Sequence, residues 1–327
     1  MKNTESQKVS LGLLNTGDIL RSRYRILRSL GSEDFARRNL LSDSDTYLAE
    51  DLDRDNERCV LREFAPQLRE ISTLEKAREL FEREAGVFYR LQHPQVPQFR
   101  ELFCYKKQDE SRLFLLKSYI AGQTYRTLLD RRIKSNTRFD EEEILKLLND
   151  ILSILEYIHS MGVIHRNISP NHLILRSQDN RAVLIDFGCI KEIENKAQLE
   201  LNGALPSILR AIDTSYAPPE QVERGVVYAH SDLYALAATA VVLLTGKEPQ
   251  QLIDFGSYRW YWRSAVTINP KLEWILTTML SPYPRNRFGS AAEVKQILQD
   301  ISVEETVPVV KPKPKLKSFY SAINKLF

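Results

Sequence analysis

Apolar positions along this chain change their spacing about one third of the way from the N-terminus. Between residues 24 and 120 they form short extended runs, interrupted by one stretch, 74–91, where they recur every three or four positions as on one face of a helix. The predicted strands are 24–31, 46–49, 59–64, 98–105 and 113–120. The pattern predicts a β-rich first part that contains a single helix.

Helical spacing dominates after residue 120. Asp140 and Glu143 form a capping box ahead of a long amphipathic pattern over 144–158. Residues 232–245 are apolar on every side, as expected of a helix at the centre of a lobe. The remaining predicted helices are 271–280 and 291–301.

This order of elements predicts an α+β protein with two lobes. The small lobe is rich in strands and has one helix, and the larger lobe is helical. The predicted segments, in order, are an N-terminal extension, the small lobe, the large lobe, and a linker followed by a tail: 1–22, 23–119, 120–302 and 303–327.

Charge is distributed unevenly and concentrates at the C-terminal end. The net charge is only +3, and residues 309–327 carry five lysines and no acid, so the rest of the chain is slightly acidic and no nucleic-acid partner is expected. The Lys-Pro repeat at 311–315 predicts an extended linker. Four apolar residues that fall on one helical face follow it: Leu316, Phe319, Ile323 and Phe327. Two interpretations remain open for 316–327, a solvated tail or a helix that contacts a membrane surface or a protein partner.

The cysteines and apolar segments bear on the compartment. Cys59, Cys104 and Cys189 are widely spaced, which favours neither a disulfide framework nor a zinc site. The longest apolar run, 233–244, is shorter than the ~18 residues that a membrane span needs. The polar N-terminus lacks the apolar stretch of a signal sequence. We therefore expect a soluble, cytoplasmic protein.

Three motifs in the second half carry candidate chemistry. His165-Arg166-Asn167 opens the segment 165–172, Asp-Phe-Gly occupies 186–188, and Ala-Pro-Pro-Glu occupies 217–220. In this order and spacing they resemble the catalytic loop, the metal-binding DFG and the APE segment of protein kinases. The segments Ile-Ser-Pro, in the catalytic loop, and Tyr-Ala-Pro-Pro-Glu-Gln resemble the corresponding segments of cyanobacterial serine/threonine kinases.

The resemblance implies roles for further residues. Those at the nucleotide are Gly31, Arg62, Glu84, Lys117 and Tyr119, and the implied metal ligands are Asp186 and His172. The residues with an implied structural role are His165, Arg166, Glu220, Asp232 and Arg287, and Glu220 is expected to pair with Arg287. The implied ligands are ATP and Mg²⁺ or Mn²⁺.

Several of these positions depart from the kinase pattern. Asn167 stands where kinases have the aspartate that takes or orients the substrate proton, and an amide is not basic at neutral pH. His172 replaces the asparagine that holds the second magnesium, and imidazole suits Mn²⁺ or Zn²⁺ better than Mg²⁺. The chain has no glycine-rich loop, because side chains that include two carboxylates follow Gly31, and 37–45 resembles an insertion.

Two further departures concern the small lobe. Arg62 replaces the strand lysine that contacts the phosphates, and its planar fork favours a bidentate grip on Glu84. Lys117 lies at the position that gates the back of the adenine pocket. There it either pairs with Glu84, obstructs adenine or extends past the pocket.

These departures favour a pseudokinase, which would act by binding a protein partner and retain residual nucleotide or metal binding. The alternative is a weak or unorthodox ATP-dependent serine/threonine kinase that uses Asp186 and a bound metal. A third hypothesis, a nucleotide or metal sensor, requires binding alone.

Overall fold

The computed structural model of the chain describes residues 14–30, 46–64, 71–107, 110–187, 191–192 and 215–304. Within these ranges the side chains of 71–77, 80, 84, 107, 110–111, 191–192 and 300–304 are left out of the description. Gly31, the 37–45 insertion and the tail after residue 304 lie outside the described residues, as does the side chain of Glu84.

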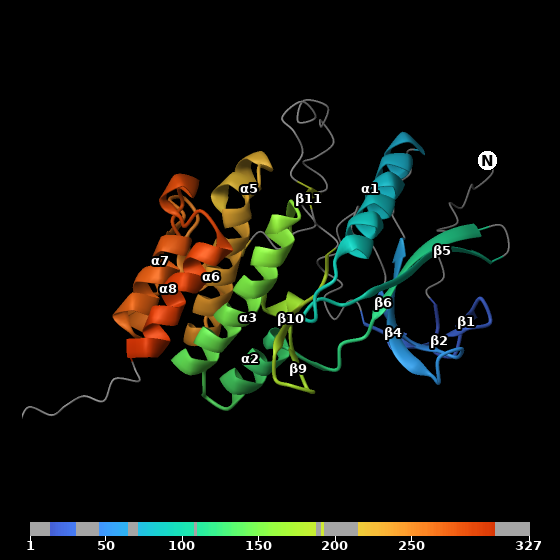
Figure 1. The fold of residues 1–327 in the computed structure, drawn as a ribbon, viewed down its shortest axis with the longest axis horizontal. Coiled ribbons are helices and arrows are strands. Elements are labelled where there is room, and N and C mark those ends of the chain that lie inside the picture. The colour runs from blue at the N-terminus through green and yellow to red at the C-terminus, as the bar shows by residue number, and fades with distance from the viewer. Residues whose placement is uncertain are drawn as a thin grey trace, which may run out of the picture.

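A six-stranded antiparallel sheet forms the first lobe, on the right in Figure 1. Its order is β1-β2-β3-β4-β6-β5, so the last two strands exchange places relative to the chain. The strands are β1 (Ile19–Leu20), β2 (Tyr24–Ser29), β3 (Thr46–Asp51), β4 (Glu57–Phe64), β5 (Phe99–Lys107) and β6 (Glu110–Ser118). The residues of β1, inside the segment expected to be an N-terminal extension, pair with β2.

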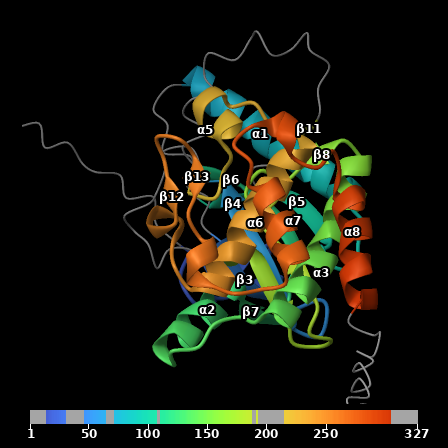
Figure 2. The ribbon, with the colours of Figure 1, turned by 90° about the vertical axis from the view of Figure 1, so that its left-hand side faces the viewer.

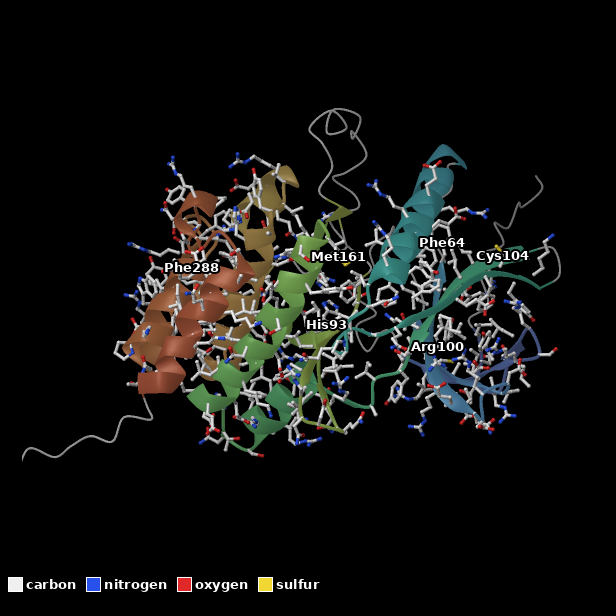
Figure 3. All side chains as sticks on the ribbon, viewed as in Figure 1. Phe64, His93, Arg100, Cys104, Met161 and Phe288 are labelled. Atoms are coloured by element: carbon white, nitrogen blue, oxygen red, sulfur yellow. The ribbon has the colours of Figure 1, made fainter. Side chains whose placement is uncertain are left out.

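Helix α1 (Ile71–Arg90) packs against one face of this sheet. Its residues Phe81 and Ala85 are buried in a cluster with two leucines of β6. The ring of Phe64, labelled in Figure 3, lies 5.2 Å from that of Phe81. Near the end of α1, Phe88 instead belongs to the large core of the second lobe. Helix α1 therefore contributes to two cores.

The second lobe consists of helices around α6 (Ala229–Thr245), in which every residue from Ser231 to Thr245 is buried. Its other helices are α2 (Tyr125–Lys134), α3 (Glu141–Ser160), α5 (Pro219–Arg224), α7 (Pro270–Met279) and α8 (Ala291–Glu304). Helix α6 contacts α3, α7 and α8, as Figure 2 shows. The predicted capping box of Asp140 and Glu143 is confirmed at the start of α3. No helix in the described part of the chain is long and apolar enough to cross a bilayer.

Short strands outside the first lobe form three further small sheets among the described residues. One of these sheets has three strands in the order β10-β9-β7. The other two sheets have two strands each, β8 with β11 and β12 with β13. These strands are β7 (Gly122–Thr124), β8 (Val163–Ile164), β9 (Leu173–Arg176), β10 (Ala182–Leu184), β11 (Lys191–Glu192), β12 (Ile253–Asp254) and β13 (Arg259–Trp260). A Cβ at Gly122 would collide with the backbone carbonyl of Leu175, so β7 can approach β9 this closely only with glycine there.

A buried ion pair joins α5 to the segment between α7 and α8. Arg287 donates to the Glu220 carboxylate at 2.7 Å and 2.9 Å, and the side chains are 0% and 4% exposed. The Ser231 hydroxyl donates to the same carboxylate at 2.8 Å, and the guanidinium lies 4.9 Å from the ring centre of Tyr234. The chain therefore contains the Glu220–Arg287 pair that its resemblance to kinases implies.

We expect Arg287→Ala to lower the free energy of unfolding by about 3–5 kcal/mol, because it leaves the Glu220 carboxylate buried without its cation. Denaturant unfolding followed by circular dichroism measures this change. Lys295→Ala is the matched control, since it removes an exposed ion pair with Glu156, and we expect it to cost less than about 1 kcal/mol. Equal losses in the two variants would contradict this account.

Candidate active site

The backbone of the catalytic loop is held by Asp232, which lies in the first turn of α6 and is fully buried. Its carboxylate accepts the backbone N–H groups of His165 at 2.9 Å and Arg166 at 2.8 Å. The Nε2 atom of His159, on α3, lies 2.8 Å from the same carboxylate. Burial alone would raise the pKa of Asp232, but the hydrogen bond and the charge of His159 outweigh this and hold the pKa below its usual value.

The loop that starts there places Asn167 beside Asp186, in the region between the loop and the sheet residues Arg62 and Lys117, which we call the cleft. Arg166 adopts a left-handed backbone conformation with φ of 71°, which turns the chain just before Asn167. Asn167 is buried, and its side-chain Nδ2 lies 3.4 Å from an Asp186 carboxylate oxygen. Its backbone carbonyl faces the Nδ1 atom of His172 at 2.7 Å. The amide can orient a neighbouring group, but it cannot take a proton at neutral pH.

Asp186 lies two residues after the end of β10, and its side chain contacts the catalytic loop at His172. Its side chain is 33% exposed, its φ is 60°, and one of its oxygens lies 3.2 Å from His172 Nε2. Burial by itself would raise the pKa of the Asp186 carboxyl. Electrostatic interactions with His172, Arg62 and Lys117 outweigh this effect and hold the pKa of Asp186 well below its usual value. Asp186 is therefore ionised at neutral pH.

The next residue, Phe187, fixes the position of Asp186 through packing. Its ring is buried and meets His165 edge-on, with ring centres 4.8 Å apart. On its other side it contacts Phe88 of α1, with centres 5.5 Å apart. Since the packing of this phenylalanine sets whether the preceding aspartate faces the cleft, α1 and the catalytic loop together determine where the carboxylate lies.

The small lobe contributes cationic groups above the cleft. Arg62 lies in β4, with its guanidinium 5.4 Å from the ring centre of Phe81. Lys117 in β6 is paired in register with Val60 of β4, so both side chains lie on the sheet face that carries Arg62. Tyr119 follows β6, and Arg58 lies 6.0 Å from its ring centre. The pairing of Arg62 or Lys117 with Glu84 stays a prediction, because the Glu84 side chain is outside the description.

Two buried contacts at the loop were not predicted from the sequence. Gln221, after Glu220, donates from Nε2 to the carbonyl of Arg166 at 2.9 Å. His159 supplies the third partner of Asp232. Gln221 belongs to the kinase-like segment Tyr-Ala-Pro-Pro-Glu-Gln, so its sequence context could have indicated a role at the loop. His159 lies in an amphipathic helix without a motif, and nothing in the sequence indicates its contact with Asp232.

Comparison with known proteins is decisive for the family. A family model for the protein kinase domain matches residues 59–300. The chain belongs to the protein kinase family. Serine/threonine-protein kinase B of Synechocystis sp. (strain ATCC 27184 / PCC 6803 / Kazusa) is 35% identical over 88% of this chain and 48% of its own length. Serine/threonine-protein kinase PknA of Nostoc sp. (strain PCC 7120 / SAG 25.82 / UTEX 2576) is 33% identical over 90% of this chain and 50% of its own.

The kinase domain thus spans about half the length of the curated relatives it matches. A solved structure of the kinase domain of Mycobacterium tuberculosis PknI superposes with a TM-score of 0.63 at 22% identity. That likeness covers 89% of this chain and 100% of the solved one, and it shows the fold. The predicted bilobal α+β kinase fold is confirmed.

The kinase fold implies Mg²⁺ at this cleft, and the residues fit it only in part. Asp186 offers the carboxylate that a divalent cation requires. His172, beside it, offers an imidazole nitrogen where magnesium prefers oxygen, and Asn167 directs its Nδ2 rather than its amide oxygen toward Asp186. The described residues contain no group of three or more His, Cys, Asp or Glu side chains that could hold a metal by themselves. A cation here would depend on phosphate and water for its remaining ligands.

His165 gives the cleft a defined dependence of stability on pH. Burial lowers its pKa to about 4, whereas an unfolded histidine titrates near ~6.5. Below pH ~6.5 the unfolded chain therefore binds a proton that the folded one does not, and the stability contributed at this site falls as the pH falls toward 4. We expect a loss of about 2 kcal/mol between pH 7 and pH 5 from this group.

Denaturant unfolding of the wild type and of His165→Asn at both pH values measures this loss as the difference between the two proteins. Nuclear magnetic resonance of labelled histidine gives the midpoint directly. An imidazole of His165 that titrates above pH 6 in the folded protein would contradict the interpretation.

Proposed function

We propose that this chain is a slow ATP-dependent serine/threonine protein kinase. Support comes from its relatives, since the Synechocystis and Nostoc proteins that cover most of this chain carry the name serine/threonine-protein kinase. The proposal means that the γ-phosphate of ATP passes to a serine or threonine hydroxyl of a protein. The hydroxyl oxygen forms the new bond to phosphorus, the bond to the bridging oxygen of ADP breaks, and the hydroxyl proton leaves to solvent.

The observation that carries the proposal is the position of Asp186. Phe187 is packed between His165 and Phe88, and the ionised carboxylate of Asp186 faces the catalytic loop. Catalysis of phosphoryl transfer is mostly positioning and electrostatic stabilisation, and protein kinases need this aspartate in place for it. A divalent cation bound there would neutralise charge on the phosphates. The cationic groups of Arg62 and Lys117 favour an anionic ligand in the same cleft.

The rate is low because of Asn167. General-base help by a positioned side chain contributes about 10²–10⁴ to a rate, and the Asn167 amide cannot provide it. Ordinary kinases turn over at about 1–100 s⁻¹. The remaining positioning of Asp186 gives measurable transfer below that range.

A second candidate function, partner binding without transfer, is favoured by the contact between His172 and Asp186. The imidazole lies where kinases place an oxygen ligand, and it occupies one side of the carboxylate. Under this candidate the cleft holds nucleotide without turnover, and the lobes present a surface to another protein. The two candidates differ in one measurable respect, which is transfer of label that depends on Asp186.

We expect purified protein to transfer labelled phosphate from ATP to a mixed protein substrate slowly, in assays with Mg²⁺ and with Mn²⁺. Asp186→Ala should abolish the transfer. Asn167→Asp should raise kcat by about 10²-fold or more, because it restores the base. The matched control is Asn180→Asp, which makes the same chemical change in an exposed turn and should leave kcat unchanged.

The outcome against the proposal is equally specific. If the wild type transfers no label that depends on Asp186, while Asn167→Asp does, the natural chain is the partner-binding protein of the second candidate. Thermal melts of each variant separate loss of activity from loss of folding.

A further inference from the structure

A polar cavity of about 260 Å³ lies on the face of the small-lobe sheet opposite the cleft. Leu116 of β6 lines it, whereas its neighbour Lys117 lies on the face that carries Arg62, because successive strand residues point to opposite faces. The charged residues that line this cavity are Arg23, Arg54, Arg100, Asp51 and Glu101. Three arginines therefore meet two carboxylates in a cavity that is separate from the cleft.

A β-bulge in β5 brings Arg100 into this cavity. Phe99 and Glu101 pair with adjacent residues of β6, so Arg100 between them is one residue more than the partner strand has. Bulges re-aim side chains, and here Arg100 and Glu101 line the same cavity although they are consecutive in the strand. Figure 3 shows Arg100 on the side of β5 away from α1.

The guanidinium of Arg100 has a buried donor without an acceptor. Its side chain is only 12% exposed, and its Nη2 donates to the carboxylate of Glu57. Its Nη1 is buried and has no hydrogen-bond partner among the residues that the structure describes. A buried donor on a charged group is costly when it lacks an acceptor, so Nη1 calls for one in the cavity that Arg100 lines.

The second arginine, Arg54, is near a carboxylate but does not hydrogen-bond to it. Asp51 is fully buried and accepts two hydrogen bonds from Arg23, at 2.6 Å and 2.8 Å. Arg54 Nε lies 3.9 Å from Asp51, and its side chain is 58% exposed. Asp51 pairs in register with Glu57, the partner of Arg100, so these arginines gather at one end of the sheet.

The other lining carboxylate, Glu101, also has partners of its own. It accepts a hydrogen bond from the Tyr24 hydroxyl at 2.7 Å and another from Arg21. Both carboxylates in the cavity wall are therefore compensated by an arginine, which reduces their repulsion of a bound anion.

We infer that this cavity binds the phosphate group of a small phosphomonoester, with Arg100 and Arg54 as its donors. The planar fork of arginine matches the oxygens of phosphate and binds them through paired hydrogen bonds. The volume lies below the roughly 300–1,000 Å³ of sites for drug-sized ligands, which favours a small metabolite. The inference does not depend on phosphoryl transfer in the cleft.

The test is titration calorimetry of the full chain with glycerol phosphate and with inorganic phosphate. Glycerol and acetate are the comparison ligands, since one lacks the charge and the other replaces phosphate by a carboxylate. We expect both phosphate probes to bind and both comparison ligands to bind more weakly by about tenfold or more.

Variants of opposite sign locate the site. We expect Arg100→Gln to weaken the binding of glycerol phosphate by about tenfold or more, because it removes hydrogen bonds to a charged ligand. Arg54→Gln, at an exposed position, should weaken it by about threefold. Glu57→Gln should tighten it severalfold, since it removes a negative charge that competes for Arg100.

The exposed pair Arg78–Glu82 on α1 provides matched controls. Arg78→Gln and Glu82→Gln make the same changes of charge away from the cavity, and we expect neither to alter the dissociation constant by more than about twofold. Thermal melts without ligand check that each variant is folded, and the exposed positions 54 and 57 keep the test valid if Arg100→Gln is unstable.

Three results would each overturn the inference. In the first, neither phosphate probe binds. In the second, acetate binds as tightly as glycerol phosphate. In the third, glycerol phosphate binding is lost in Arg62→Gln and unchanged in the variants at 54, 57 and 100, which would place the anion in the cleft. None of these results bears on whether the chain transfers phosphate.

Discussion

Asp232 carries a full charge inside the large lobe and satisfies it with donors from two other segments. Two of them are backbone N–H groups of the catalytic loop, and the third is the imidazole of His159 on α3. Removing any of these donors would leave a buried carboxylate short of a hydrogen bond, which is costly in a low-dielectric interior. These hydrogen bonds fix the backbone at residues 165 and 166 without using the side chain at position 167. The start of the loop is thus held in place beside an amide that has no acid–base chemistry.

The region above that loop places the Asp186 carboxylate near Arg62 and Lys117 of the small lobe and His172 of the large lobe. Their electrostatic interactions keep Asp186 ionised. Such a field attracts phosphate groups and opposes the binding of a free cation. A metal would therefore enter with the charge of a nucleotide already compensating its surroundings.

Hydrophobic periodicity predicted the long helices well. Helix α3 buries the one apolar face that its sequence pattern indicates, and α6, which is apolar on every side, is buried all round. The short strands β7, β8 and β12 were not predicted. Strands of two or three residues have no period of their own and form only where the folded chain offers a partner. Helix α2 was also missed, since its buried residues are few and charged residues surround them.

For the cleft, motif spacing predicted which residues belong to the catalytic loop and the DFG segment, and the family match bears out that resemblance. The sequence could not predict which side chains of these segments contact one another. His172 and Asp186 are separated along the chain by a hairpin, β9 and β10, so the 3.2 Å contact depends on the register of that hairpin. The hydrogen bond from Gln221 to the loop carbonyl likewise requires that α5 be docked.

Helix α1 shares its apolar residues between two cores, with Phe81 against the sheet and Phe88 against Phe187. If the helix slid or tilted, it would leave a void beside one ring and crowd another. Both changes are unfavourable because protein interiors are close-packed. A displacement of α1 would therefore alter the packing of Phe187 and, with it, the position of the Asp186 carboxylate.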